Sequence, residues 1–247
     1  MPDETDDAAA AQSFARNMET IYAARAYDTD IRYSEFSPAY LQRVHSMESA
    51  YVRALGDLRL RESLGSLRAL DFGCGNGHWM ARMASWGFRH RNLSGVDIRE
   101  GAVLVARELL GGCRIDYSAD GAIPHADAAF DVCFVNLVFT SILDEERRRQ
   151  AAAELQRVTR AGGFIFVLDF RLDNPSNSHV RKLTVGQVRG LFDHCRLVGR
   201  RSLVLAPPLA SAIAPRARWL ASALEAVPLL RTHFLAILAR QAPGDTA

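Results

Sequence analysis

The sequence predicts an α/β fold with a mostly parallel β-sheet flanked by helices. Segments typical of strands and of helices alternate from Ala69 onward, and such alternation indicates strands joined by crossover helices. The chain of 247 residues is long enough to bury one sizeable core, and it contains no internal repeat or low-complexity linker. We therefore expect a single α/β domain over residues 61–247, with other elements before it.

Seven segments have the composition of strands, at about residues 68–72, 92–96, 113–117, 130–135, 163–169, 197–205 and 232–239. Two helices are expected before the first strand. Apolar residues have helical spacing over residues 12–28, and Ser37-Pro38 begins a second helix that runs to about Leu55, since proline is tolerated in a first helical turn.

Three helices are expected in the second half of the chain. Asp144 caps a helix with one apolar face that ends just before Gly162. Another helix begins near Thr184. The pair Ala214-Pro215 begins a last helix, running to about Ala226.

The N-terminal region divides into an acidic, alanine-rich tail at residues 1–11, which we expect to be disordered, and a helical lid at residues 12–60. The tail has neither the basic nor the apolar region of a signal peptide. No stretch of the chain reaches the roughly 18 consecutive apolar residues that a membrane span needs. We expect a cytoplasmic protein without a transmembrane segment.

The composition narrows the function classes. A net charge of +2 is too mild to favour a nucleic-acid partner. The four cysteines have no CxxC spacing and suit a reduced cytoplasmic protein. The histidines have no metal-binding spacing, and Asn136, Asp169 and Asp173 are a thin ligand set for Mg²⁺, so no metal is expected.

A glycine-rich loop follows the first predicted strand, in the segment Leu70-Asp71-Phe72-Gly73-Cys74-Gly75-Asn76-Gly77-His78-Trp79. Glycines let the backbone adopt positive φ and approach a ligand, and the next helix offers free N–H groups at its N-terminus. A dinucleotide site would have glycine at position 78, which is His78 here. The loop therefore indicates a nucleotide-type cofactor, with NAD disfavoured.

This loop, with Asp71 and its three glycines, resembles the first motif of the class I S-adenosylmethionine (SAM) dependent methyltransferases. Three further segments match that family in order: Leu93 to Asp97, Ala119-Asp120-Gly121, and Glu154 to Val158 with the glycines that follow. The resemblance covers roughly residues 66 to 172. It implies a Rossmann-like sheet of seven strands in the order 3-2-1-4-5-7-6, with the last strand antiparallel.

The resemblance also implies SAM as the cofactor and S-adenosylhomocysteine as the product. Asp97 would bind the ribose hydroxyls, although it could simply cap a strand end. Asp120 would contact the adenine amino group, although aspartate also favours turns. Asp71 would either hold the loop amides or reach the methionine ammonium. The predicted cofactor-binding residues are Asp71, Gly73, Cys74, Gly75, Asn76, Gly77, Asp97, Ile98, Ala119, Asp120, Gly121, Asn136 and Tyr33.

Three residues are candidates for the reaction itself: His78, Asn136 and Arg171. Asn136 follows the fourth strand, where ligands of open α/β sheets bind, but the Pro-Pro pair of nucleic-acid adenine methyltransferases is absent. His78 lies at a helix N-terminus, which disfavours its charged form, and could merely flank the cofactor. Arg171 is in a polar loop that either reads the acceptor or is a solvated connection.

Methyl transfer is an in-line displacement that depends mainly on alignment, so no universal catalytic residue is required. The segments around residues 32–41 and 205–234 are similar to bacterial glycan and secondary-metabolite methyltransferases. This softer resemblance implies O-methylation of a hydroxyl on a small molecule or glycan in a bacterial biosynthetic pathway. Tyr27, Arg32 and Tyr33 could fold over the cofactor as a lid. N-methylation of an amine, a non-catalytic methyltransferase-like partner subunit and a homodimer stay open as alternatives.

Overall fold

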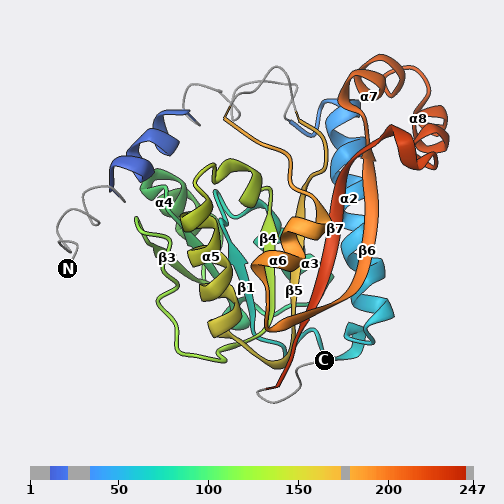
Figure 1. Ribbon diagram of the computed structural model, residues 1–247. Helices are drawn as coiled ribbons and strands as arrows, with labels where there is room; N and C mark the ends of the chain where they lie inside the picture. The colour runs from blue at the N-terminus through green and yellow to red at the C-terminus, as the bar shows by residue number, and fades with distance from the viewer. Residues whose placement is uncertain (1–11, 22–33, 174–178, 243–247) are drawn as a thin grey trace.

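The fold is built on one seven-stranded sheet. The computed structural model describes residues 12–21, 34–173 and 179–242, and the strand order is β3-β2-β1-β4-β5-β7-β6 (Figure 1). The strands are β1 (Ala69–Phe72), β2 (Leu93–Asp97), β3 (Arg114–Tyr117), β4 (Phe130–Asn136), β5 (Thr159–Phe170), β6 (Cys195–Leu205) and β7 (Arg231–Arg240). The predicted strand order and the antiparallel β7 are both confirmed.

The centre of the sheet is parallel and buried. β1 pairs in parallel with β2 and with β4, and every residue of β1 and β2 is buried. Strands covered on both faces need continuous apolar side chains, which the segment from Ala69 to Phe72 supplies apart from Asp71. The edge strands are less covered, because β3 has a single buried residue and β6 is fully buried only at its last three residues. The carboxyl ends of β1, β2 and β4 therefore meet at one edge.

Helices cover both faces of this sheet. Side chains of α2 (Pro38–Asp57), α3 (His78–Trp86) and α4 (Glu100–Leu109) pack in one core cluster, together with Phe134 and Phe166 of the sheet. Side chains of α5 (Glu145–Val158) and α6 (Val185–Leu191) pack in a second cluster on the opposite face. Figure 1 shows α5 and α6 in front of the sheet and α2 behind it.

The helix starts follow the capping residues of the sequence. Ser37 accepts a hydrogen bond from the backbone of Tyr40, and Pro38 occupies the first turn of α2. Asp144 caps α5 as predicted, and Thr184 forms a capping box with Gln187 at α6. The end of α5 differs from the expectation, because β5 begins directly at Thr159. Gly162, with φ of +72°, lies inside that strand next to a register shift.

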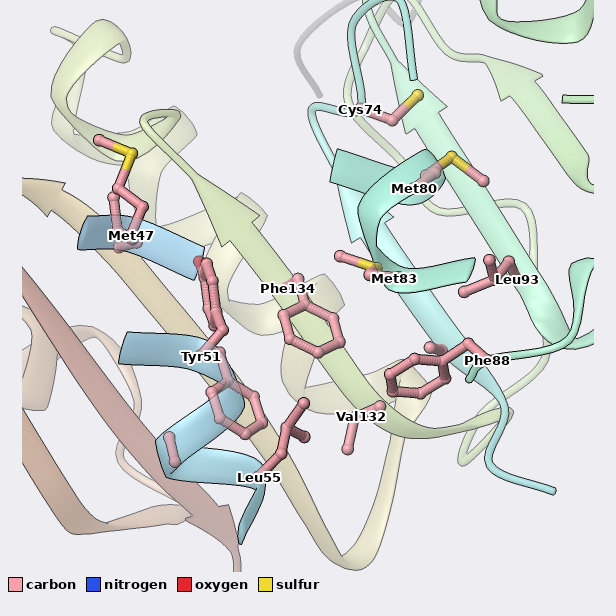
Figure 2. Packing of buried hydrophobic residues seen from close by; sticks show 14 of the residues in the cluster. Met47, Tyr51, Leu55, Cys74, Met80, Met83, Phe88, Leu93, Val132 and Phe134 are labelled. Atoms are coloured by element: carbon pink, nitrogen blue, oxygen red, sulfur yellow. The ribbon is translucent and has the colours of Figure 1, made fainter. Parts of the chain in front are cut away.

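The position of α2 modifies the predicted lid at residues 12–60. Tyr51, Ala54 and Leu55 of this helix are fully or almost fully buried in the same cluster as Ala69 and Phe134. Figure 2 shows the rings of Tyr51 and Phe134 close together between α2 and β4. The second half of the predicted lid is therefore a layer of the core, and a boundary at residue 60 does not separate two cores.

Two short helices connect β6 to β7: α7 (Pro207–Ile213) and α8 (Arg218–Glu225). The predicted helix from Ala214 to about Ala226 corresponds to α8, which begins later, at Arg218, and the helix α7 before it was not predicted. Pro207 and Pro208 occupy the first turn of α7, whereas Pro215 lies between the two helices, where no helical N–H is needed. Ala39 of α2 packs against this helix pair.

The N-terminal helix, residues 12–21, lies beside the start of α4 (Figure 1). The predicted tail at residues 1–11 and the lid residues Tyr27, Arg32 and Tyr33 lie outside the described residues. Within the described parts of the chain, no helix combines the length and the apolar character needed to cross a membrane.

Candidate functional site

A cavity of about 320 Å³ lies at the carboxyl ends of β1, β2 and β4, and we call it the carboxyl-edge cavity. Its volume is within the range of small-molecule sites, and open α/β sheets bind ligands at this edge. Seven of the predicted cofactor-binding residues line it: Gly73, Asp97, Ile98, Ala119, Asp120, Gly121 and Asn136. The structure therefore brings these seven residues together at one cavity.

The three loop glycines have different physical roles. All three have positive φ, at 73° for Gly73, 54° for Gly75 and 84° for Gly77. A Cβ on Gly73 would overlap Val138, and one on Gly77 would overlap Leu110. At Gly75 the nearest atom is Nη2 of Arg99, at 3.0 Å. Gly73 and Gly77 are thus required by internal packing, whereas a side chain at Gly75 would meet only the end of the Arg99 side chain.

The loop is tied to β2 by backbone bonds and by one side chain. The N–H groups of Gly73 and Cys74 donate to the Val96 carbonyl at 2.8 and 3.1 Å. The N–H of Gly75 donates to Oδ2 of Asp97 at 2.7 Å, while Oδ1 accepts from the Arg99 backbone N–H at 2.8 Å. A carboxylate has about four acceptor positions, so Asp97 Oδ2 retains the capacity to accept a ligand hydroxyl.

Asp71 and Asn136 form a buried polar pair behind the loop. Asn136 Nδ2 donates to Oδ1 of Asp71 at 3.1 Å, and Asp71 is only 1% exposed. Among the described residues, Asp71 Oδ2 has no hydrogen-bond partner. Burial raises the pKa of Asp71 to about 7, with the Asn136 hydrogen bond opposing and the Asp97 charge adding to that rise. A buried, unpartnered carboxylate oxygen is costly unless a donor such as a ligand ammonium reaches it.

The Asp120 segment lines the cavity through its loop conformation. Oδ1 of Asp120 accepts from the Ala122 backbone N–H at 3.0 Å and from the Ser118 hydroxyl at 2.7 Å. These bonds lower the pKa of the Asp120 carboxyl, the Ser118 bond most of all. Oδ1 of Asp120 is therefore engaged in the turn, which agrees with the alternative that this aspartate stabilises a turn. Contact between Oδ2 and adenine stays a prediction.

Two further groups of residues line the cavity and were not predicted: Phe14 and Met18 of the N-terminal helix, and Arg147, Gln150, Ala151 and Glu154 of α5. The Arg147 guanidinium lies over the Phe14 ring, 4.9 Å from its centroid. Phe14 and Met18 are four residues apart, so a helix presents them on one face. The spacing of Phe14 and Met18 in the sequence indicates an apolar helix face, but it does not indicate which part of the protein that face covers.

Several predicted residues are not among those that line the cavity. Cys74 is buried beneath the loop, where desolvation raises the pKa of its thiol, and Asn76 follows it in the loop. His78 Nε2 accepts a hydrogen bond from Arg82 Nε at 3.2 Å, and burial lowers the pKa of His78. His78 is therefore bonded to Arg82 and does not line the cavity, so its position gives no support to a role in the reaction.

Arg171 lines a second, more open cavity of about 1210 Å³, which we call the β6–β7 cavity. Arg171 Nη1 donates to the Pro228 carbonyl at 3.4 Å. Arg53, Arg200, Arg201 and Arg231 line the same cavity, whereas Glu225 is the one acidic residue among the described residues that line it. The two cavities share no lining residue in the described parts of the chain. Arg171 is therefore separate from the carboxyl-edge cavity.

The described residues contain no group of three or more histidine, cysteine or acidic side chains placed to hold a metal ion. All four cysteines are free thiols. The charged groups nearest the loop are instead Asp71, Asp97 and Arg99, which interact with backbone N–H groups, an amide or each other.

The strand order, the glycine loop and the carboxylate at the end of β2 define the class of the fold: a Rossmann-like methyltransferase fold. Residues 70–167 match the family model described as a methyltransferase domain, and the resemblance to class I SAM-dependent methyltransferases is confirmed. The match spans β1 to most of β5, which is the part of the sheet that builds the carboxyl-edge cavity.

The chain is similar in part to malonyl-[acyl-carrier protein] O-methyltransferase of Serratia marcescens, with 38% identity over 96 residues. This segment is 39% of the chain and 35% of the relative, so the chain matches about a third of that protein's length.

Solved structures agree on the fold. The PH0226 protein of Pyrococcus horikoshii OT3 has a TM-score of 0.60 at 14% identity, covering 88% of this chain and 99% of that one. The [4+2]-cyclase SpnF has a TM-score of 0.53 at 16% identity, covering 75% of this chain and 81% of that one. Because a protein described as a cyclase has this fold, the fold alone does not determine the reaction.

Proposed function

We propose that this protein is a SAM-dependent methyltransferase that transfers the methyl group to an oxygen atom of a small molecule or glycan. The observation that carries the proposal is the Asp97 carboxylate, which holds Gly75 of the loop while facing the carboxyl-edge cavity. One side chain thus joins the glycine loop to the site where a ribose would bind. The product of the reaction would be S-adenosylhomocysteine.

The residues fit SAM along the length of the cavity. Asp97 Oδ2 would accept from a ribose hydroxyl, and the loop from Ala119 to Ala122 would face the adenine. Val96, Ile98 and Phe14 provide apolar surface for the base. Asp71, with its unpartnered Oδ2, would accept from the methionine ammonium, because none of its described hydrogen bonds is to a loop amide.

The acceptor would enter beside the end of β4. Asn136, Leu137 and Val138 line the cavity there, and Leu137 has a φ of +59°, a backbone conformation that is uncommon outside glycine and concentrates at functional sites. Arg171 in the β6–β7 cavity would contact a part of the acceptor remote from the reacting atom. Holding the oxygen close to the methyl and in line with the breaking bond supplies much of the acceleration.

A carboxylate is a second candidate for the acceptor oxygen. No described residue that lines the carboxyl-edge cavity is a histidine. An alcohol must lose its proton during attack, whereas a carboxylate arrives ionised and needs no base. The partial relative is named for O-methylation of a malonyl group, which bears a free carboxylate. The arginines of the β6–β7 cavity would suit an anionic substrate.

Binding and turnover test the proposal separately. Isothermal titration calorimetry should detect SAM and S-adenosylhomocysteine, and the absence of heat and of a thermal shift at millimolar ligand would contradict it. Release of S-adenosylhomocysteine is then followed with paired acceptors that carry either a hydroxyl or a carboxylate. We expect turnover to be unchanged by EDTA. Loss of turnover on chelation, restored by Mg²⁺, would contradict the metal-free mechanism.

A further inference from the structure

Three buried polar side chains form a continuous hydrogen-bonded chain from α2 to β1, the strand that precedes the glycine loop. The hydroxyl of Tyr51 in α2 donates to Oδ1 of Asn136 at the end of β4. Asn136 Nδ2 donates in turn to Oδ1 of Asp71 in β1, two residues before Gly73. Asn136 also lines the carboxyl-edge cavity, whereas Tyr51 does not. The chain therefore links the core layer behind the sheet to the cavity wall.

The direction of each hydrogen bond follows from chemistry. Asn136 turns its NH₂ group toward Oδ1 of Asp71, which accepts, and its carbonyl oxygen toward the Tyr51 hydroxyl, which donates. A phenol can donate to that carbonyl, and burial raises the pKa of Tyr51 well above its ordinary value, which keeps the proton on the hydroxyl. Without the hydroxyl, the amide could rotate and turn its oxygen toward the carboxylate.

The Tyr51 ring is held rigidly. It is 0% exposed, and its centroid lies 5.5 Å from those of Trp79 and Phe134 and 5.9 Å from that of Trp86. Figure 2 shows this ring packed among the apolar side chains of the cluster. A phenylalanine would fill the same space, so packing alone does not require the hydroxyl. The hydroxyl is the part of the side chain that forms a hydrogen bond with Asn136.

We propose that Tyr51 is a positioning residue for cofactor binding, acting through the Asn136 amide on the Asp71 carboxylate. This inference rests on the proposed function, since the cofactor in question is SAM. Tyr51 fixes the orientation of Asn136, and Asn136 fixes Oδ1 of Asp71, while Oδ2 of Asp71 has no hydrogen-bond partner among the described residues. In this way α2 contributes to the affinity of a cavity that none of its residues lines.

A double-mutant cycle tests this role, with SAM affinity measured by calorimetry for the wild type, Tyr51→Phe, Asn136→Ala and the double variant. We expect Tyr51→Phe to weaken SAM binding about tenfold, and the double variant to bind no more weakly than Asn136→Ala alone. A purely structural tyrosine would give additive losses. Melting temperatures of all four proteins show whether each is folded.

Phe166→Leu is the matched packing control. The centroid of the Phe166 ring lies 6.1 Å from that of the Tyr51 ring, and Phe166 takes no part in the hydrogen-bonded chain. We expect it to lower the melting temperature while changing SAM affinity less than twofold. Wild-type affinity in Tyr51→Phe, or additive losses in the double variant, would overturn the positioning role and leave the proposed function intact. Failure of the wild type to bind SAM would instead overturn both.

Discussion

Oδ2 of Asp97 lies 2.7 Å from the backbone nitrogen of Gly75, so the carboxylate that faces the cavity also holds the middle glycine of the loop. The loop glycine with the most open space above it is therefore fixed by the residue expected to bind the ribose. Loss of either partner should disturb both the shape of the loop and its affinity for ligand.

Asp97→Ala should weaken SAM binding by about 2–3 kcal/mol, because hydrogen bonds to charged groups contribute about 1.5–3 kcal/mol each. Calorimetric titration of the folded variant measures this. Asp116→Ala is a suitable control, since Asp116 pairs with Arg114 on the edge strand β3, away from the cavity. Equal dissociation constants for wild type and Asp97→Ala would assign Asp97 a structural role only.

Gly75→Val should abolish SAM binding and leave the protein folded. A β-branched side chain would occupy the space above the loop and would be strained at a φ of +54°, but it meets only the end of the Arg99 side chain. Gly73→Ala should instead lower stability, because its Cβ would overlap Val138. Circular dichroism and SAM titration separate these effects. A folded Gly75→Val with normal affinity would place the cofactor elsewhere.

Asp71→Asn should change the pH dependence of stability. The folded pKa of Asp71 is about 7, above the value of about 3.9 for an exposed aspartate. Between those values the folded state holds a proton that the unfolded state has lost. The stability contributed by this group is complete below about pH 4 and is lost as the pH rises through about 7.

The measurement for this prediction is the free energy of unfolding of wild type minus that of Asp71→Asn, taken from pH 4 to pH 8 by urea titration. We expect the difference to fall by more than about 1 kcal/mol over that range. Asp169, whose pKa burial raises to about 6, titrates in both proteins and cancels in the difference. A flat difference would mean that Asp71 titrates normally. SAM binding should be weaker in the variant throughout.

Phe14→Ala should lower SAM affinity several-fold, because the Phe14 ring forms part of the cavity wall and of a contact with Arg147. The N-terminal helix would still form, so the melting temperature without ligand should change little. Leu104→Ala on the exposed side of α4 serves as the control for an unrelated apolar truncation. Unaltered affinity in Phe14→Ala would exclude this helix from the ligand site.

Arg171→Ala should impair use of the acceptor far more than binding of SAM, because Arg171 lines the β6–β7 cavity and not the carboxyl-edge cavity. Steady-state kinetics with an identified acceptor would show a raised KM for the acceptor, while the calorimetric affinity for SAM stays the same. If neither the acceptor KM nor kcat changes, acceptor recognition lies away from this loop.

The sequence was sufficient where local chemistry determines local structure. Buried parallel strands need short apolar runs, and all seven were located to within a few residues. The segment from Gly73 to Gly77 and Asp97 could be recognised because loop geometry and spacing are both local properties. Pro215 was misleading, since proline suits both a helix start and the gap between two helices, and Pro207-Pro208 began the earlier helix.

The rest of the site depends on tertiary packing. Phe14 is far in sequence from Arg147 and Glu154 of α5, and these residues line one cavity only because the N-terminal helix and α5 lie over the same strand ends. The role proposed for Tyr51 could not be predicted either, because a tyrosine among apolar residues of a helix predicts only a side chain that packs in the core. Its hydroxyl acquires a partner only when α2 packs against β4 and brings Asn136 within reach.

The insertion of β7 between β5 and β6 has a consequence for how the chain folds during synthesis. β5 and β6 are synthesised before β7. Each of them pairs with β7, and they do not pair with each other. Until β7 arrives, β5 has an open edge that can pair with another strand, and β6 has no partner in the sheet. Chains released or paused before residue 231 should therefore be prone to aggregation and to depend on chaperones.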